Sequence, residues 1–243
     1  SIMRAQWHPS PDTCTPVAVD QGLQRMFFGS NSSIFSPQRS SNNQYHFLWL
    51  TMPLYGNGDL ARYSGQVMTA NGTQLFPLTG RTIHDSVAWT STNGAHSAQR
   101  SGNSVIFSWW NGTHRLAQRY VTANRPCWTL PGIQVFPDSV SGHFAIASDG
   151  KDGVYLACHG RGLGQILLQH IDSSGHALHD SARSLIYNPP TQHSNWQGLR
   201  ILDDEQDGVF VVWERDITDP LDPYYGTHGV VAQRAGPDGQ ARW

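Results

Sequence analysis

The 243-residue chain contains very little lysine or glutamate: Lys151 is its single lysine, and Glu205 and Glu214 are its two glutamates. Charged residues of all kinds make up 14% of the sequence. Because helices favour Ala, Leu, Glu and Lys, this scarcity argues against a helix-rich fold. Glycine is plentiful, with 24 residues, and the aromatic residues comprise nine Trp, nine Phe and eight Tyr. This composition favours many short strands joined by tight turns.

Other absences narrow the classes of function. No apolar run approaches the roughly 18 residues needed to cross a membrane, so we expect no membrane span. The net charge of −2, with scattered arginines, gives no basic patch for nucleic acid. The cysteines Cys14, Cys127 and Cys158 lack a Cys-x-x-Cys spacing, and we expect no metal and no cofactor. The start at Ser1, without a signal peptide, is expected for a processed product or a fragment.

A short strand-like segment that contains glutamine recurs along the chain. The recurring glutamines are Gln6, Gln66, Gln118, Gln169 and Gln233, separated by 60, 52, 51 and 64 residues. Each is followed by a turn and then by an aromatic or apolar residue. A period of this length is typical of propeller blades.

The later units are built from four strand-like segments, which we name a, b, c and d in chain order; the last unit has the first three. The b segments end in Trp or a substitute, at Trp49, Trp109, Cys158 and Trp213, and the glutamine lies in c. The sequence therefore predicts an all-β fold, a β-propeller of four-stranded blades with four full repeats plus an N-terminal remnant, hence four- or five-bladed. The expected units of this single domain, 1–243, are approximately 1–19 (the remnant), 32–83, 94–135, 142–187 and 197–243.

The two ends of the chain complement each other in this scheme. The last unit contains segments a, b and c and stops at Trp243 without d, whereas Pro16 to Val19 resembles a d strand. We expect the N-terminal strand to complete the last blade and so to cover a sheet edge. The number of blades in the closed ring stays open, because the remnant also contains a c-like segment, from Met3 to Trp7.

This pattern resembles a family of secreted bacterial β-propeller repeats, whose blades read roughly D-G-x-x-x-x-W … A-Q-R-x-x-x-x-G-x-x-x-W. The best match is Asp207-Gly208 with Trp213, followed by Ala232-Gln233-Arg234 with Gly239 and Trp243. Partial matches occur at Ala117-Gln118-Arg119 and around Gln169. The resemblance implies the architecture and an extracellular or cell-surface location. It implies no chemistry, because a fold does not determine a function.

The repeated residues have structural interpretations. A Trp at the end of every b strand is most simply a core residue between blades. The repeated Gln is expected to satisfy buried backbone groups between strands. Asn71 with Gly72 and Ser174 with Gly175 supply the positive φ angles that hairpin turns need.

The loops between b and c differ greatly in length and composition, whereas the c–d turns are short and similar. Because functional residues concentrate in loops on a rigid scaffold, the b–c loop face is the candidate binding face. Its candidate ligand-binding residues are Tyr55, Trp110, His159, Arg161, Glu214, Arg215, Tyr224 and Tyr225. Aromatic rings with Arg and carboxylate partners can hold a sugar, and Trp, Tyr and Arg also dominate protein interfaces. We therefore expect a non-enzymatic binding or scaffolding propeller that holds a carbohydrate or a protein partner, with possible assembly into a larger complex.

The alternative function is a propeller-type glycoside hydrolase, which would need two paired carboxylates. Its candidates are Asp149, Asp203, Asp204, Glu205, Glu214 and Asp216. Most of these lie in a–b turns, where surface Asp is ordinary. Two further possibilities are disfavoured: a calcium site at Asp216, Asp219 and Asp222, and a metal held by His170, His176 and His179. Neither matches a known ligand spacing.

Overall fold

In the computed structural model, all regular structure of the described residues is β-strand. The described residues are 24–27, 38–39, 43–53, 61–76, 81–87, 97–101, 104–111, 113–122, 125–136, 144–159, 165–179, 183–186, 198–216 and 228–242. Within them, no helix is long and apolar enough to span a membrane. The chain is an all-β protein of several small antiparallel sheets, which confirms the coarser part of the predicted fold.

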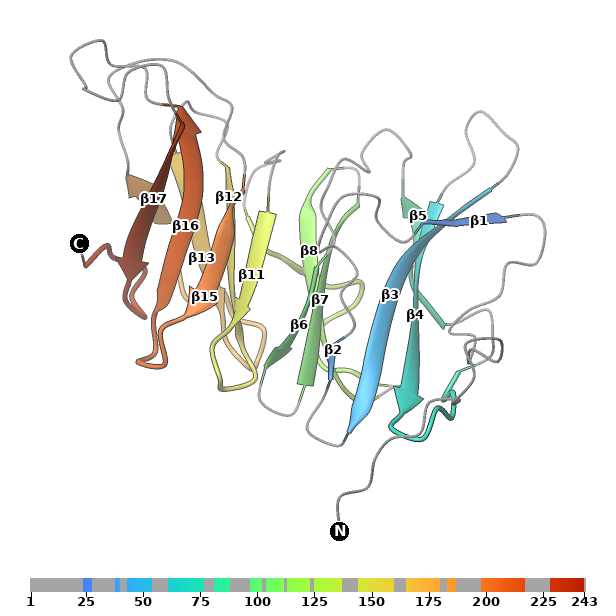
Figure 1. Cartoon of the computed structure of the whole chain (residues 1–243). Helices are drawn as coiled ribbons and strands as arrows, with labels where there is room; N and C mark the ends of the chain where they lie inside the picture. Colours follow the sequence, from blue (N-terminus) through green and yellow to red (C-terminus); the bar gives the residue numbers. More distant parts are fainter. Residues whose placement is uncertain are drawn as a thin grey trace.

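The strands form four sheets, A to D, in chain order (Figure 1). Sheet A contains β1 (Gln24–Phe27), β2 (Gln38–Arg39), β3 (Gln44–Pro53), β4 (Ala61–Thr69) and β5 (Arg81–Val87). Sheet B contains β6 (Ser97–Ser101), β7 (Ser104–Trp110), β8 (Arg115–Thr122), β9 (Arg125–Pro126) and β10 (Ile133–Gln134). Sheet C contains β11 (Phe144–Ser148), β12 (Val154–His159), β13 (Gln165–Ile171) and β14 (Arg183–Ile186). Sheet D contains β15 (Arg200–Asp203), β16 (Val209–Asp216) and β17 (His228–Ala235).

The order of strands within the sheets follows the predicted a, b, c and d segments. The a strands are β2, β6, β11 and β15, the b strands β3, β7, β12 and β16, and the c strands β4, β8, β13 and β17. The d strands described are β5, β10 and β14. The expected strand at Pro16 to Val19 lies outside the described residues. Two short strands were not expected: β1, which pairs with the end of β3, and β9, which pairs with β8.

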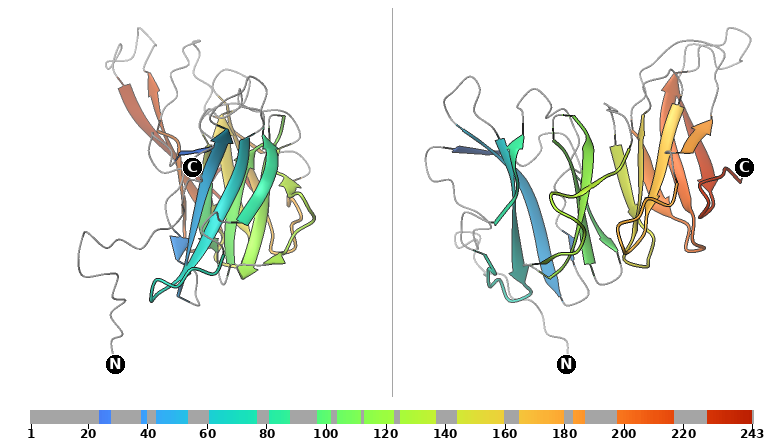
Figure 2. Two further views of the ribbon diagram at one scale, coloured as in Figure 1. Left: turned by 90° about the vertical axis from the view of Figure 1, so that its right-hand side faces the viewer. Right: turned by 180° about the vertical axis from the view of Figure 1, so that it is seen from behind.

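The sheets lie side by side in a row, with sheet A and sheet D at opposite ends (Figures 1 and 2). The a strands of neighbouring sheets contact one another, since β11 touches both β6 and β15, and β2 touches β6. Sheet C therefore has a neighbour on each face. This explains why Val154 to Cys158 of β12 are buried without alternation.

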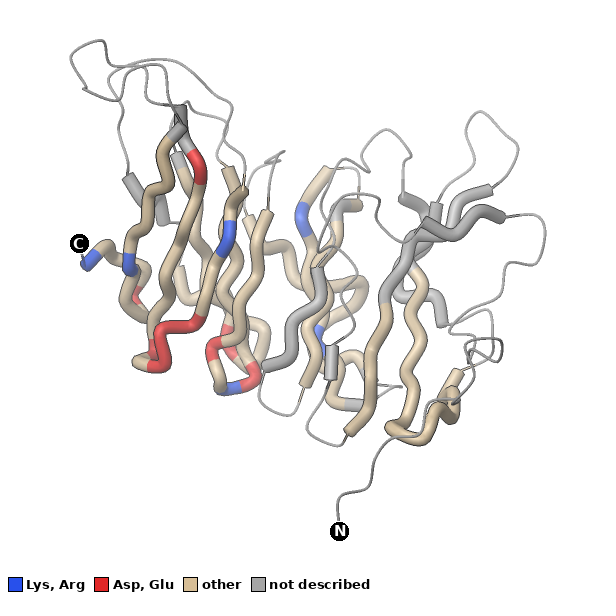
Figure 3. Tube along the Cα trace, viewed as in Figure 1, with Lys and Arg blue, Asp and Glu red and all other residues tan. Residues whose placement is uncertain are grey.

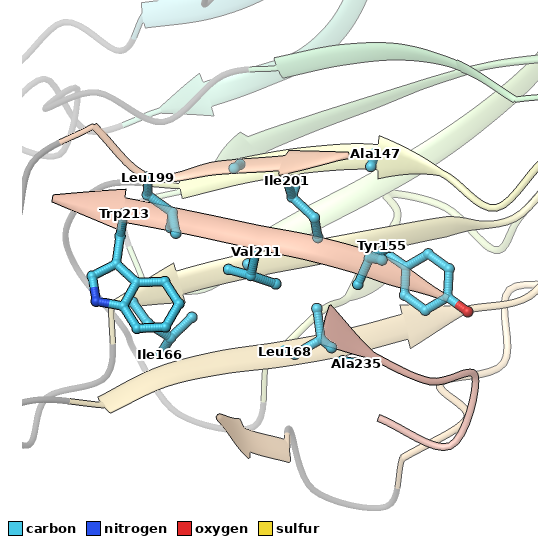
Figure 4. Packing of buried hydrophobic residues seen from close by; sticks show 12 residues of the cluster. Ala147, Tyr155, Ile166, Leu168, Leu199, Ile201, Val211, Trp213 and Ala235 are labelled. Atoms are coloured by element: carbon cyan, nitrogen blue, oxygen red, sulfur yellow. The ribbon is translucent and has the colours of Figure 1, made fainter. Parts of the chain in front are cut away.

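The core between sheets C and D is an apolar cluster in which side chains from both sheets interdigitate (Figure 4). Ile166 and Leu168 of β13 are buried there with Val211 and Trp213 of β16. A second cluster fills the space between sheets B and C and includes Ile106, Trp128, Val135, Phe136, Leu156 and Cys158. Burial of side chains of this size contributes about 1.5–3 kcal/mol each, so inter-sheet packing is the main source of stability.

Two of the tryptophans that end the b strands are buried core residues. Trp109 and Trp213 are almost completely buried, and Cys158 occupies the same repeat position in sheet C. This confirms the structural interpretation at these positions. The side chain of Trp49 lies outside the described part of the chain.

The repeated glutamine makes the same pair of hydrogen bonds in three sheets. In sheet B, Gln118 Oε1 accepts from the backbone N–H of Trp128 at 2.9 Å, and Gln118 Nε2 donates to the Trp128 carbonyl at 3.2 Å. Gln66 binds Phe76 in this way, and Gln169 binds His179. In each case the partner follows ten residues after the glutamine, beyond the c–d turn. The predicted role is thus confirmed for Gln66, Gln118 and Gln169, each of which satisfies buried backbone groups.

His46 of β3 links sheet A to sheet B. Its ring is buried and lies 6.4 Å from the ring of Phe107 in β7, centroid to centroid. Burial penalises the charged imidazolium and lowers the pKa of His46 to about 4. The folded chain therefore holds this histidine in its neutral form.

Substitution of Gln118 by Ala should lower the free energy of unfolding by about 1–3 kcal/mol, because it leaves a buried N–H and a buried carbonyl without their partner. Urea unfolding of Gln118→Ala should be compared with Gln240→Ala, which changes an exposed glutamine in the last turn. Equal unfolding midpoints for the two variants would contradict the proposed role.

Acidification should destabilise the fold through His46. Above pH 6.5 His46 is neutral in both the folded and the unfolded chain, so the free energy of unfolding does not depend on its titration. Below pH 6.5 the unfolded chain binds a proton at His46, whereas the folded chain does not. The free energy of unfolding should therefore fall by about 2 kcal/mol between pH 7 and pH 5, a window above most carboxylate titration. In His46→Phe this part of the slope should disappear, as measured by urea unfolding across pH. The exposed His176→Gln variant controls for loss of a histidine, and an unchanged slope in His46→Phe would refute the assignment.

Candidate ligand-binding face

The b strands β3, β7, β12 and β16 all run toward the same edge of the row, the upper edge in Figure 1. We call it the b–c edge, because the b–c connections lie there. Four of the eight candidate ligand-binding residues fall in the described part of it: Trp110, His159, Glu214 and Arg215. The other four, Tyr55, Arg161, Tyr224 and Tyr225, lie outside the described residues.

Each of the four described candidates lies at or close to the end of its b strand. Trp110 pairs with Arg115 across sheet B, and His159 pairs with Ile166 across sheet C. In sheet D, Glu214 and Arg215 precede the last residue of β16. The structure thus brings residues from three sheets to one edge. For Trp110 and Arg215 it describes the backbone position and not the side chain.

Glu214 is held beside the start of sheet D. A Cβ atom at Gly198 would lie 2.8 Å from Oε1 of Glu214, so the side chain packs directly against this glycine. Gly198 also has a φ of +68°, a left-handed conformation that favours glycine. Glu214 as a residue is exposed.

The turn that follows Trp110 is short and closed by hydrogen bonds. Asn111 Oδ1 accepts from the backbone N–H of Thr113 at 2.9 Å and of His114 at 2.7 Å, and Asn111 N donates to the His114 carbonyl. Such a side-chain-closed turn restricts the backbone. Trp110 is therefore followed by a residue whose side chain and backbone are both hydrogen-bonded.

Sequence reasoning missed Arg115, the first residue of β8. Its side chain is buried, with 3% exposure, and its guanidinium carbon lies 4.1 Å from the centroid of the Phe144 ring of sheet C. A cation over an aromatic face is favourable, especially when water is excluded. The only sequence signal was an arginine at the start of a c strand. The burial depends on Phe144, which belongs to a different sheet.

Arg115 also influences Cys158, which is buried nearby. Burial raises the pKa of the Cys158 thiol to about 12, although the charge of Arg115 opposes this shift. The thiol is therefore protonated near neutral pH and unsuited to nucleophilic chemistry. Arg115 places a buried positive charge between sheets B and C, near the b–c edge.

The opposite edge of sheets C and D, which carries the a–b turns, is acidic (Figure 3). Asp149 Oδ1 accepts from the N–H groups of Lys151 and Gly153, both at 2.8 Å, and Asp204 Oδ1 accepts from those of Gln206 and Gly208. A Cβ at Gly153 would collide with the Asp149 carboxylate, which explains the glycine that ends each turn. These carboxylates close turns, as the turn interpretation predicted.

The two turn carboxylates differ in the partner of their second oxygen. Asp149 Oδ2 lies 3.0 Å from Nε2 of His170, and Asp204 Oδ2 accepts from Nε of Arg234 at 2.8 Å. Burial raises the pKa of each carboxyl, but these hydrogen bonds and those of the turn amides outweigh burial, so that both pKa values lie below the ordinary range. Both groups are therefore charged near neutral pH.

His170, His176 and His179 do not converge. The His170 ring stacks on Tyr155, with a centroid distance of 4.0 Å, whereas the Nδ1 atom of His176 lies 3.7 Å from Asp172 Oδ2. No group of three His, Cys, Asp or Glu side chains in the described ranges could hold a metal ion. Of the three aspartates considered for calcium, Asp219 and Asp222 lie outside those ranges.

No protein-family profile and no curated protein matches this chain. Solved structures show a distant resemblance. One, from a study of two prolyl endopeptidases, is 16% identical over 93% of this chain and 28% of the other, with a TM-score of 0.42. This chain thus spans little more than a quarter of that protein.

The α-L-arabinanase of Cellvibrio cellulosa is 12% identical over 85% of this chain and 75% of its own, with a TM-score of 0.35. Its complex with arabinohexaose is 13% identical over 84% and 74%, with a TM-score of 0.34. At these values the resemblances carry no argument about function.

Replacement of Asp204 by Ala should destabilise the protein by about 1–3 kcal/mol, because two turn N–H groups and the Arg234 guanidinium lose their acceptor. Glu205→Ala in the same turn is the matched control, since its side chain is exposed. Thermal and urea unfolding should separate the two variants, with Asp204→Ala clearly less stable. If they unfold together, the Asp204 contacts do not stabilise the turn.

Proposed function

We propose that the chain is a β-propeller of four-stranded blades that acts as a non-enzymatic binding or scaffolding module outside the cell. The regular a-b-c-d order of the sheets supports this architecture, as do the contacts between the a strands of neighbouring sheets. In a propeller the blades stack face to face around a channel, with the first strands innermost. The extracellular or cell-surface location follows from the resemblance to secreted repeats.

The proposed binding face is the b–c edge, and the ligand is a carbohydrate. The observation that carries this proposal is the convergence of Trp110, His159 and Glu214 from three sheets on one edge, beside the buried charge of Arg115. An indole ring can stack on a sugar ring, while imidazole, carboxylate and guanidinium groups bond its hydroxyls. No cofactor, nucleic acid or membrane enters the proposal. Assembly into a larger complex is compatible with it.

The alternative, a glycoside hydrolase, has less support. Such an enzyme uses two carboxyl groups at one site, one of them with a raised pKa. Asp149 and Asp204 instead have lowered pKa values, and they precede the starts of β12 and β16, whereas Glu214 lies near the other end of β16. A protein partner at the b–c edge is the second candidate, because Trp and Arg are common interface anchors.

A glycan array should show selective binding by the purified chain, and the double variant Trp110→Ala, Arg215→Ala should lose it. Removal of anchors at the centre of a site costs about 2 kcal/mol or more, so the affinity should fall by at least about thirtyfold in calorimetry.

Arg242→Ala is the matched control for this measurement. It removes an exposed arginine from the last c–d turn, on the opposite edge, and should bind like the unmodified chain. A negative array would reject carbohydrate and favour a protein partner. Turnover of a bound glycan, detected by mass spectrometry, would instead establish the hydrolase.

A further inference from the structure

The c–d turn has the same backbone hydrogen bonds in sheets A, C and D. In sheet A this turn follows β4: Gly72 N donates to the Thr69 carbonyl at 3.0 Å, and Thr69 N donates to the Thr73 carbonyl at 2.9 Å. The equivalent donor and acceptor pairs are Gly175 with Asp172 and Asp172 with His176 in sheet C, and Gly239 with Gly236 and Gly236 with Gln240 in sheet D. The three turns can therefore be compared residue by residue.

The glycine of each turn is explained by its backbone conformation. Gly72, Gly175 and Gly239 have φ of 84°, 89° and 70°, in the left-handed region that favours glycine. Gly72 is therefore required by the turn itself.

The turns of sheets A and D also use a side-chain oxygen at the same position. In sheet D, Asp238 Oδ1 accepts from the backbone N–H of Gln240 at 3.0 Å. In sheet A, Asn71 Oδ1 accepts from the backbone N–H of Thr73 at 3.3 Å. Because a carboxylate oxygen serves in sheet D, the turn requires the side-chain oxygen of Asn71 and not its amide nitrogen.

The amide nitrogen of Asn71 has no role in this turn. Asn71 is exposed, and in the described part of the chain its side-chain hydrogen bonds all end on Oδ1. One of them comes from the Thr73 hydroxyl, at 3.0 Å, and Thr73 is exposed as well. The turn does not require this hydroxyl either, since His176 and Gln240 occupy the position of Thr73 in sheets C and D.

The two groups that the turn does not require belong to one recognisable sequence. Asn71-Gly72-Thr73 is an Asn-x-Thr sequence, the kind at which N-linked oligosaccharides are attached in surface loops of secreted proteins. The equivalent residues are Ser174-Gly175-His176 in sheet C and Asp238-Gly239-Gln240 in sheet D. Among the three equivalent turns, the one in sheet A alone has this sequence.

We propose that Asn71 is the acceptor of an N-linked oligosaccharide, a modification that rests on the proposed location of the chain outside the cell. In this reaction Nδ2 of Asn71 attacks C1 of a sugar that is carried on a lipid pyrophosphate. The bond from C1 to Nδ2 forms while the bond from C1 to the pyrophosphate oxygen breaks. The pyrophosphate leaves with the electron pair, and the transferase takes one proton from Nδ2. The product keeps Oδ1, so the hydrogen bonds of the turn are retained.

The modified turn lies away from the proposed ligand-binding face. It follows β4, which ends at the lower edge of sheet A in Figure 1, whereas the b–c edge is the upper one. An oligosaccharide on Asn71 therefore leaves the b–c edge accessible.

A second Asn-Gly-Thr sequence, which begins at Asn111, provides an internal comparison. Asn111 is only half-exposed, and its Oδ1 accepts from the backbone N–H of Thr113 and of His114 at the b–c edge. Because Asn111 is less accessible than Asn71, we expect the oligosaccharide at Asn71 and not at Asn111. The Asn-Ser-Ser sequence at Asn31 lies outside the described residues.

Peptide mapping of the full chain, secreted by a eukaryotic host, tests this proposal. Mass spectrometry should find an oligosaccharide on the peptide that contains residue 71, and peptide N-glycosidase should remove it and leave Asp at this position. The same chain produced in the bacterial cytoplasm should have the unmodified mass. Absence of carbohydrate from Asn71 in the secreted chain would overturn the proposal, and so would modification of Asn111 alone.

Substitutions taken from the equivalent turn separate the modification from the fold. Asn71→Asp copies Asp238 and keeps the acceptor oxygen, and Thr73→Gln copies Gln240. Each should lose the oligosaccharide while circular dichroism shows a folded chain. Thr73→Ser keeps the hydroxyl and should keep the oligosaccharide. Retention of the oligosaccharide in Thr73→Gln, or its complete loss in Thr73→Ser, would contradict recognition of this sequence.

The modification and the proposed ligand binding can fail independently. The glycan array, repeated with secreted Asn71→Asp, measures ligand binding without an oligosaccharide at position 71. A negative array beside a modified Asn71 peptide would reject the carbohydrate ligand alone. A positive array beside an unmodified Asn71 peptide would reject the modification alone.

Discussion

Sheet C of this protein has two apolar faces, and a single layer of short strands cannot bury both by itself. β12 illustrates the constraint, because its side chains are buried on both sides of sheet C. Sheets B and D lie against these two faces and remove them from water. The stacking of sheets, rather than any single contact, is therefore what the other features depend on.

The buried polar side chains named below form hydrogen bonds with backbone groups that are nearby in the sequence. Gln66, Gln118 and Gln169 each pair with the backbone just beyond the c–d turn, so that the turn folds back onto its own c strand. Asp149 and Asp204 do the same for the a–b turns. These hydrogen bonds join residues that are close in the sequence, so each repeat can form its own set. The same hydrogen bonds restrict the backbone of the a–b and c–d turns at the edge where these turns lie.

The b–c connections differ from sheet to sheet in length and sequence. A rigid scaffold with one variable edge is the usual arrangement for a binding protein. The buried guanidinium of Arg115 places a positive charge in the core near this edge. A ligand at that edge would thus meet positions set by several sheets at once.

The sequence by itself determined the strand order, the a–b turns and the roles of the repeated Gln and Trp. These follow from patterns within a few residues: alternation along a strand, turn residues such as Asn71-Gly72, and the fixed period of the repeat. The tertiary structure alone decided that β1 pairs with β3, that Arg115 is buried under Phe144, and that Val230 is exposed whereas Ile166 is buried. These outcomes depend on which sheet lies against which, and Val230 and Ile166 occupy the same place in the repeat. The local sequence pattern cannot predict this difference in burial, because burial depends on the neighbouring sheet that covers a side chain and not on the side chain itself.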